Sequence, residues 1–142
     1  MRLSSLASAR PAYYDRNATS GSIAYQGTSI APHADTQRAT VTLASGKRAF
    51  LEATSLIYIR ATAATAATFV YASASLIPSG GTGVGYLLVP QINNTVGTVS
   101  NISLGGSLTI GAGDVLSLYT SDTSTGGTYN YYLAIKYTQF DA

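Results

Sequence analysis

The sequence holds few of the side chains from which catalytic and metal sites are built. It contains one histidine, no cysteine and six acidic residues scattered along the chain. His33 stands two residues before Asp35, so both could lie on one face of an extended segment, but a metal site normally uses three or four ligands. One histidine is also a poor general base for so many serines. We therefore expect a structural or surface role for His33, with no metal, no cofactor and no enzyme activity.

Two glycine-containing segments have the composition of ligand-binding loops. Residues 81–85 read GTGVG, but no predicted helix and no Lys-Ser or Lys-Thr pair follows them, so we do not expect a phosphate site. Asp114 follows Gly113 at a predicted turn, where a carboxylate accepts hydrogen bonds from backbone amides. A calcium site at Asp114 or Asp122 is a weaker hypothesis, because calcium takes six or more oxygen ligands.

Tyrosine is the aromatic residue in excess, with eleven copies against three phenylalanines and no tryptophan. A tyrosine ring can be buried at an interface while its hydroxyl reaches water or a partner. Several tyrosines cluster in the last apolar segment, where each could pack in the core or the set could form a subunit interface. The residues that we predict at such an interface are Tyr129, Tyr131, Tyr132, Leu133 and Tyr137.

The composition indicates one domain whose surface is rich in hydroxyl groups. A chain of 142 residues fits a single domain, and only 10% of its residues are charged, against about 25% in an average soluble domain. Serine and threonine together number 35. A surface with so few charges is coated with hydroxyls and partly hidden against other subunits. No apolar run approaches the roughly 18 residues that cross a bilayer, and a net charge of +2 does not indicate nucleic-acid binding.

Alternation of apolar and polar residues predicts strands over most of the chain. The clearest pair is 115–120 and 129–138, joined by a connector with Gly126 and Gly127 that predicts a hairpin or a longer strand-to-strand loop. Further strands are expected at 38–43, 47–60, 69–77, 86–89 (stopped by Pro90), 96–104 and 108–110. About eight short strands without a helix predict an all-β fold, an antiparallel β-sandwich or jelly roll.

Two segments depart from a simple strand pattern. The stretch 47–60 has apolar residues at both odd and even positions, which suggests a strand that is covered on both faces. Residues 61–68, ATAATAAT, are expected to form a loop or crossover, because eight residues cannot hold an isolated helix.

The first 36 residues lack sustained periodicity, and we expect them to form an extended N-terminal arm ahead of a β domain at 37–142. The first 60 residues hold seven of the eight basic residues and three of the six acids, so positive charge is concentrated near the front of the chain. Tyrosine and isoleucine side chains in this region favour an arm that orders on a partner over a solvated tail.

The last third of the chain resembles the tumour necrosis factor-like and complement-head-like jelly roll. The resemblance rests on LTIGAGDVLSLYTSD, a Gly-Asp turn before an alternating strand, and on the aromatic closing strand TYNYYLAIKY. Members of that superfamily form trimers around their final strands. The resemblance therefore implies a homotrimer with part of 129–137 near its axis.

The run RATVTLASGKRAFLEATSLIYIRATAAT resembles small bacteriophage virion proteins, in which a strand, a Ser-Gly-Lys or Pro-Gly-Lys turn and a long strand open the domain. Phage capsid decoration (cement) proteins place such a β domain on the shell as a trimer, with an arm that reaches neighbouring subunits. This resemblance implies contacts between the arm and the major capsid protein. The residues expected to make them are Arg2, Arg10, Tyr13, Tyr14 and Arg16.

The leading functional hypothesis is a structural protein of the virion exterior, a trimeric capsid decoration protein that clamps capsid subunits through its arm. The alternative is a receptor- or glycan-binding head of a phage fibre or spike, since the same jelly roll serves there. Against that alternative, residues 1–36 show no coiled-coil or collagen-like repeat, and the loops at 79–85 and 121–127 contain no aromatic residue. A minor tail or neck protein is the third possibility.

Overall fold

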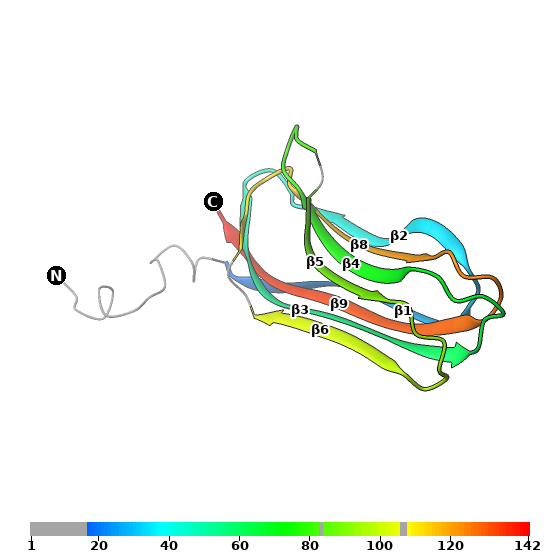
Figure 1. Ribbon diagram of the computed structural model, residues 1–142. Coiled ribbons are helices and arrows are strands. Elements are labelled where there is room, and N and C mark those ends of the chain that lie inside the picture. Colours follow the sequence, from blue (N-terminus) through cyan, green and yellow to red (C-terminus); the bar gives the residue numbers. More distant parts are fainter. Residues whose placement is uncertain (1–16, 83, 106–107) are drawn as a thin grey trace.

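The computed structural model describes residues 17–82, 84–105 and 108–142, which form nine strands in two antiparallel sheets packed face to face (Figure 1). The strands are β1 (Thr19–Ile30), β2 (His33–Thr42), β3 (Lys47–Thr62), β4 (Val70–Ile77), β5 (Val84–Gln91), β6 (Val99–Gly105), β7 (Thr109–Ile110), β8 (Val115–Asp122) and β9 (Thr128–Asp141). Within this described part, no helix is long and apolar enough to span a membrane.

The strand order confirms the predicted sandwich and identifies it as a jelly roll. One sheet has the order β1-β9-β3-β6, with β7 also paired to β3, and the other has the order β2-β8-β4-β5. The pairs nest in the sequence: β4 with β5, β3 with β6, β2 with β8 and β1 with β9. Such nesting results when one long antiparallel ribbon wraps around a core. Because β8 and β9 lie in different sheets, their connector is a loop between sheets and the hairpin alternative is wrong.

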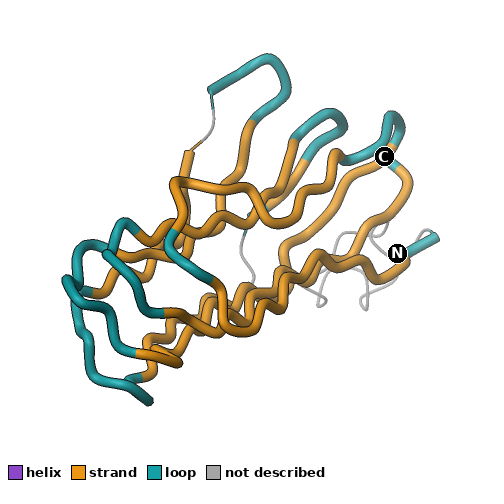
Figure 2. The backbone as a smooth tube through the Cα atoms, turned by 90° about the vertical axis from the view of Figure 1, so that its right-hand side faces the viewer, coloured by secondary structure: helices purple, strands orange, loops and turns teal. Residues whose placement is uncertain are grey.

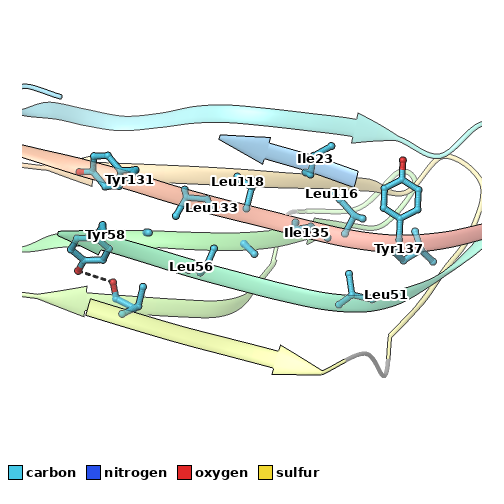
Figure 3. Packing of buried hydrophobic residues seen from close by; sticks show 14 of the residues in the cluster. Ile23, Leu51, Leu56, Tyr58, Leu116, Leu118, Tyr131, Leu133, Ile135 and Tyr137 are labelled. Carbon is cyan, nitrogen blue, oxygen red and sulfur yellow. Dashed lines mark hydrogen bonds between the residues drawn. The ribbon is translucent and has the colours of Figure 1, made fainter. Parts of the chain in front are cut away.

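Strand β9 lies at the centre of the five-stranded sheet, between β1 and β3. Its odd-numbered residues from Tyr129 to Tyr137 face the core, as the alternation predicts. Figure 3 shows Tyr58 and Tyr131 at one end of the buried cluster and Leu51 and Tyr137 toward the other. The rings of Tyr58 and Tyr131 are 5.7 Å apart between centroids, and the Tyr58 hydroxyl donates to the Val89 carbonyl at 3.0 Å.

The long strand β3 has two apolar faces because its alternation changes phase. Its pairing with β9 shifts between Leu51 and Ala53, and such a bulge places one extra residue in one strand. Before the shift the odd positions Ala49 and Leu51 are buried, and after it the even positions from Thr54 to Arg60 are buried. One core-facing row therefore continues across the bulge, and the prediction that the other face of β3 is also covered stays a prediction.

The predicted boundary between arm and domain does not hold in the described residues. Residues 19–30 form β1, an edge strand that pairs with β9, and residues 33–36 belong to β2. The alternation in β1 is hidden in the sequence because Gly21 and Gly27 occupy two core-facing positions. A side chain at position 21 would collide with the Tyr137 ring, 2.3 Å from the position of its Cβ, so this ring fills the space that the glycine leaves.

Strand β5 continues through Pro90, which we had expected to end it. β5 is at the edge of the four-stranded sheet, where a missing backbone N–H costs no ladder bond. The expected loop at 61–68 is confirmed from residue 63 onward, with a single bridge between Ala66 and Thr125.

Two opposite charges are buried among the core tyrosines. Arg60 and Asp122 are each 1% exposed, and the Arg60 guanidinium lies 4.0 Å from the centre of the Tyr129 ring. Burial raises the pKa of Tyr131, and the negative charge of Asp122 raises it further. Burial also raises the pKa of Tyr129, whereas the positive charge of Arg60 acts to lower it. Both charges therefore act on one polar cluster inside the sandwich. A ligand in solvent cannot reach this cluster, so we assign it a structural role.

Substitution of Gly127 tests the packing between the 61–68 loop and the start of β9. Gly127 and Gly80 both have a left-handed φ, +76° and +71°, but only at Gly127 would a Cβ lie 2.7 Å from the backbone nitrogen of Ala64. We expect Gly80→Ala to cost about 1–2 kcal/mol of unfolding free energy from backbone strain. Gly127→Ala should carry the same cost from backbone strain and, in addition, ~1–3 kcal/mol from overpacking against Ala64. Equal costs in urea unfolding would contradict the close packing.

Candidate functional site

The outer face of the four-stranded sheet carries a hollow that we call the serine groove. It has a volume of about 240 Å³, and Asp35, Tyr71, Ser73, Ser75 and Tyr119 line it. These residues come from β2, β4 and β8, which lie side by side in the layer drawn uppermost in Figure 1. The groove thus combines two aromatic rings, one carboxylate and serine hydroxyls.

Small side chains on the two central strands form the floor of the groove. Ser73 and Ser75 on β4 are 9% and 8% exposed, although they lie on the outer face. Ser75 pairs with Ser117 on β8, and Tyr71 pairs with Ser121. Because serine is short and tyrosine is long, the serines lie below the rings of Tyr71 and Tyr119. The Oγ atom of Ser75 is buried and makes no hydrogen bond, which is costly for a polar group.

Asp35 and Tyr71 hold each other in place across the groove. The Tyr71 hydroxyl donates a hydrogen bond of 2.6 Å to the Asp35 carboxylate. Burial, together with this bond and the negative charge of Asp35, raises the pKa of Tyr71 to about 12. Tyr71 therefore stays protonated at neutral pH and fixes the orientation of the carboxylate.

The outer face of the five-stranded sheet has a different character. A hollow of about 270 Å³ is lined there by residues that include Ala24, Ser55, Ile57, Tyr132 and Ala134, and none of its described lining residues is charged. The register places Ala24 beside Ala134 and Ser55, and Tyr132 beside Ile57. A solvated sheet face is normally polar, so this uncharged hollow has the composition of a contact surface, with Lys136 on the same face beyond it.

A second apolar surface runs along the side of the sandwich where β5 and β6 adjoin, and we call it the side patch. Its members are large apolar residues that are 46–66% exposed. They are Phe69, Leu88, Ile92, Val96 and Val99. The pairing of Val70 with Gln91 brings Phe69 next to Ile92, and the other members lie on β5, on the connection after it and at the start of β6. Val99 pairs with Ile59 on β3, so this end of the patch adjoins the outer face of the five-stranded sheet. Exposed apolar residues gathered in one region mark interaction surfaces.

The structure divides the predicted trimer-interface residues between core and surface. Tyr129 and Tyr131 are fully buried, and Leu133 and Tyr137 are 2% and 8% exposed, all within the core cluster of the same chain. These four side chains pack inside the subunit and are not available to a partner, so their assignment is corrected. Tyr132 points outward and is 39% exposed. The predicted arm contacts at Arg2, Arg10, Tyr13, Tyr14 and Arg16 lie outside the described residues.

His33 and Asp35 do not face each other. A register shift follows His33 in β2, and the His33 ring bonds the Ala31 carbonyl and the Thr120 hydroxyl at 2.8 and 2.7 Å, whereas Asp35 bonds Tyr71 on the outer face. Asp114 accepts backbone N–H bonds from Gly111 and Ser79, as predicted. Among residues 17–82, 84–105 and 108–142, no three His, Cys, Asp or Glu side chains gather as metal ligands.

No continuous stretch of the sequence predicts the serine groove. Its members lie on three strands that are far apart along the chain, and only the strand order brings them together. The alternation of serine with alanine in YASAS, residues 71–75, is the one clue, because it places the small polar residues on a single face of a strand.

Buried tyrosines should make the fold sensitive to alkaline pH. Burial raises the pKa of Tyr58, Tyr86, Tyr129 and Tyr131 above 10, and the pKa of Tyr71 rises to about 12. As the pH rises, the unfolded chain releases these phenolic protons at a lower pH than the folded chain does. The stabilisation of the fold by the protonated tyrosines is therefore complete below about pH 10 and is lost as the pH rises through the folded-state pKa values. Urea unfolding across this range should show a falling free energy, with a shallower fall for Tyr71→Phe. A constant free energy would contradict the burial of these hydroxyls.

Comparison with known proteins gives limited similarity. The sequence matches no protein family profile and no curated protein. Among solved structures, a chain described as "Structure of infectious bursal disease virus Gx strain" aligns with a TM-score of 0.41 and 15% identity, covering 88% of this chain and 32% of that one. A chain of the Gt strain aligns with a TM-score of 0.40 and 12% identity, covering 93% and 35%. The chain thus spans about a third of the length of these viral chains, and TM-scores this low support no further conclusion.

Proposed function

We propose that this chain is a non-enzymatic structural protein of a virus particle that assembles as a homotrimer. One observation carries the proposal: the domain exposes an uncharged hollow over β1, β9 and β3, together with the large apolar side chains of the side patch. Jelly rolls serve in viral capsid domains and in lectins. Because one fold supports many functions, the surfaces and not the fold decide between these uses.

Two different surfaces suit a ring of identical subunits. In a cyclic trimer the contact is head-to-tail, so each subunit presents one surface to one neighbour and another surface to the next. In this arrangement the side patch of one subunit covers Ile57 and Tyr132 of its neighbour. Since the described residues of the hollow and of the side patch carry no charge, a contact between them places no like charges against each other. Burial of exposed apolar area stabilises the ring by about 25 cal/mol per Å² before the entropic costs of association.

Light scattering after size exclusion should give three times the monomer mass for the wild-type chain. Ile57→Arg on the sheet face and Ile92→Arg on the side patch should each give monomers, because a charge is then buried in the contact. Gln37→Arg on β2, in the other sheet, is the matched control and should remain trimeric. Circular dichroism checks that each variant is folded.

An equimolar mixture of the two variants separates a head-to-tail ring from other assemblies. The Ile57→Arg chain keeps its side patch and the Ile92→Arg chain keeps its sheet face, so one intact contact can form between them. We expect a 1:1 dimer that cannot close into a ring. A monomeric wild-type protein, or trimers in both variants, would refute this assembly.

The finer assignment is a decoration protein on the capsid exterior. Residues 1–16 precede the first strand and contain Arg2, Arg10 and Arg16, which would pair with acidic groups of the major capsid protein. The resemblance to phage decoration proteins supports this role.

Deletion of residues 1–16 tests the decoration role without removing β1. The truncated chain should remain folded and trimeric but should no longer sediment with empty capsids of the parent particle. Co-sedimentation equal to that of the full chain would remove this segment from capsid binding.

The second candidate function is a glycan- or receptor-binding head. The serine groove favours it, because two aromatic rings lie there beside hydroxyl and carboxylate groups. These rings are on a sheet face, so the lack of aromatic residues in the loops at 79–85 and 121–127 does not argue against sugar binding in the groove.

A further inference from the structure

We propose that the serine groove binds one ring of a neutral sugar. This inference deepens the second candidate function and rests on it, but it does not depend on trimer formation. The groove is on the outer face of the four-stranded sheet, and the proposed contact at Ile57 and Tyr132 is on the other sheet face. The side patch borders the groove, because the Phe69 ring lies 5.8 Å from the Tyr71 ring and Leu88 pairs with Ser73. A sugar in the groove therefore leaves the contact at Ile57 and Tyr132 free.

The polar groups of the groove match the hydroxyls of a sugar. A sugar hydroxyl both donates and accepts hydrogen bonds, as a serine hydroxyl does, and a carboxylate accepts from two of them. Tyr71 already donates to one oxygen of Asp35 at 2.6 Å, so the carboxylate is oriented before a ligand arrives. Such preorganisation reduces the entropy lost on binding.

The Ser75 hydroxyl supplies an independent indication of a ligand. Ser75 is 8% exposed, lines the groove and has an Oγ without a hydrogen-bond partner. A buried hydroxyl without a partner costs about 1–3 kcal/mol. Rotation of its side chain between staggered positions can present the hydroxyl to the groove. A sugar hydroxyl in the groove would then satisfy it.

The aromatic walls and the charge of the groove restrict the class of ligand. Tyr71 and Tyr119 offer ring surfaces against which the C–H groups of a sugar can pack, as apolar contacts. Among the described residues that line the groove, Asp35 alone is charged, and a carboxylate repels phosphate, sulfate and the acidic group of a sialic acid. A neutral sugar is therefore favoured over an anionic one.

The size of the groove limits the ligand to about one sugar ring. Its volume of about 240 Å³ is below the ~300–1,000 Å³ typical of sites for drug-sized ligands. Few contacts form in so small a site, so the affinity of one groove is low. Several grooves on one particle would raise the overall affinity through multivalency.

Ligand-observed saturation-transfer NMR with the full chain tests this inference. The probes are free D-glucose, D-galactose, D-mannose and N-acetyl-D-glucosamine, with N-acetylneuraminic acid as the acidic comparison. We expect saturation transfer to at least one neutral sugar and none to the acidic one. No transfer to any neutral sugar, or equal transfer to the acid, would overturn the proposal.

Point variants then locate the site. Ser75→Ala removes the unpartnered hydroxyl and Asp35→Asn removes the charge, and each should weaken binding of the neutral sugar about tenfold. Because Ser75→Ala removes a buried polar group without a partner, its thermal unfolding temperature should not fall. Ser103→Ala on β6, in the other sheet, is the matched control and should bind as the wild type does. Unchanged binding by Ser75→Ala and Asp35→Asn would place the sugar elsewhere.

Light scattering of the same samples separates this inference from the assembly proposal. Loss of sugar binding in a variant whose mass equals that of the wild type indicates a groove effect. A wild-type trimer that binds none of the neutral sugars would overturn the sugar site and leave the assembly intact.

Discussion

The pairing of β3 with β9 is the interaction on which the rest of the structure depends. These two strands form the longest ladder in the molecule, and between them they place Tyr58, Tyr129 and Tyr131 in one buried cluster. β1 and β6 attach to the two outer sides of this pair. Figure 2 shows the strands as the body of the sandwich, with loops joining them at its ends. A change that separates β3 from β9 would therefore expose the core and detach both edge strands.

Much of the fold follows from alternation that the sequence displays directly. The apolar odd positions of β9 predict its core face, and the glycine turns predict where strands end. The burial of Arg60 and Asp122 is not predictable from the sequence, since both look like surface residues in a strand pattern. Their burial depends on a tyrosine cluster that only the tertiary structure assembles.

The predictions from sequence are wrong where the structure depends on a contact between residues that are far apart along the chain. The sequence predicts an arm at β1 because Gly21 interrupts the alternation of this strand. In the structure, the ring of Tyr137 from the neighbouring strand fills the space beside Gly21. The tyrosines of β9 were assigned to an interface because a ring suits an interface and a core equally well. The serine groove was missed because its members meet only through the order of β2, β8 and β4. In each case the missing information is a contact between residues distant in sequence.

We propose that the two outer sheet faces have different roles: copies of the chain cover Ile57 and Tyr132 on the five-stranded face, and the four-stranded face stays open around Tyr119. Hydroxyl-radical labelling read by mass spectrometry, at low and at high protein concentration, tests it most directly. We expect labelling of Ile57 and Tyr132 to fall as concentration rises, while labelling of Tyr119 stays constant. Constant labelling of Ile57 and Tyr132, or protection of Tyr119, would contradict the claim.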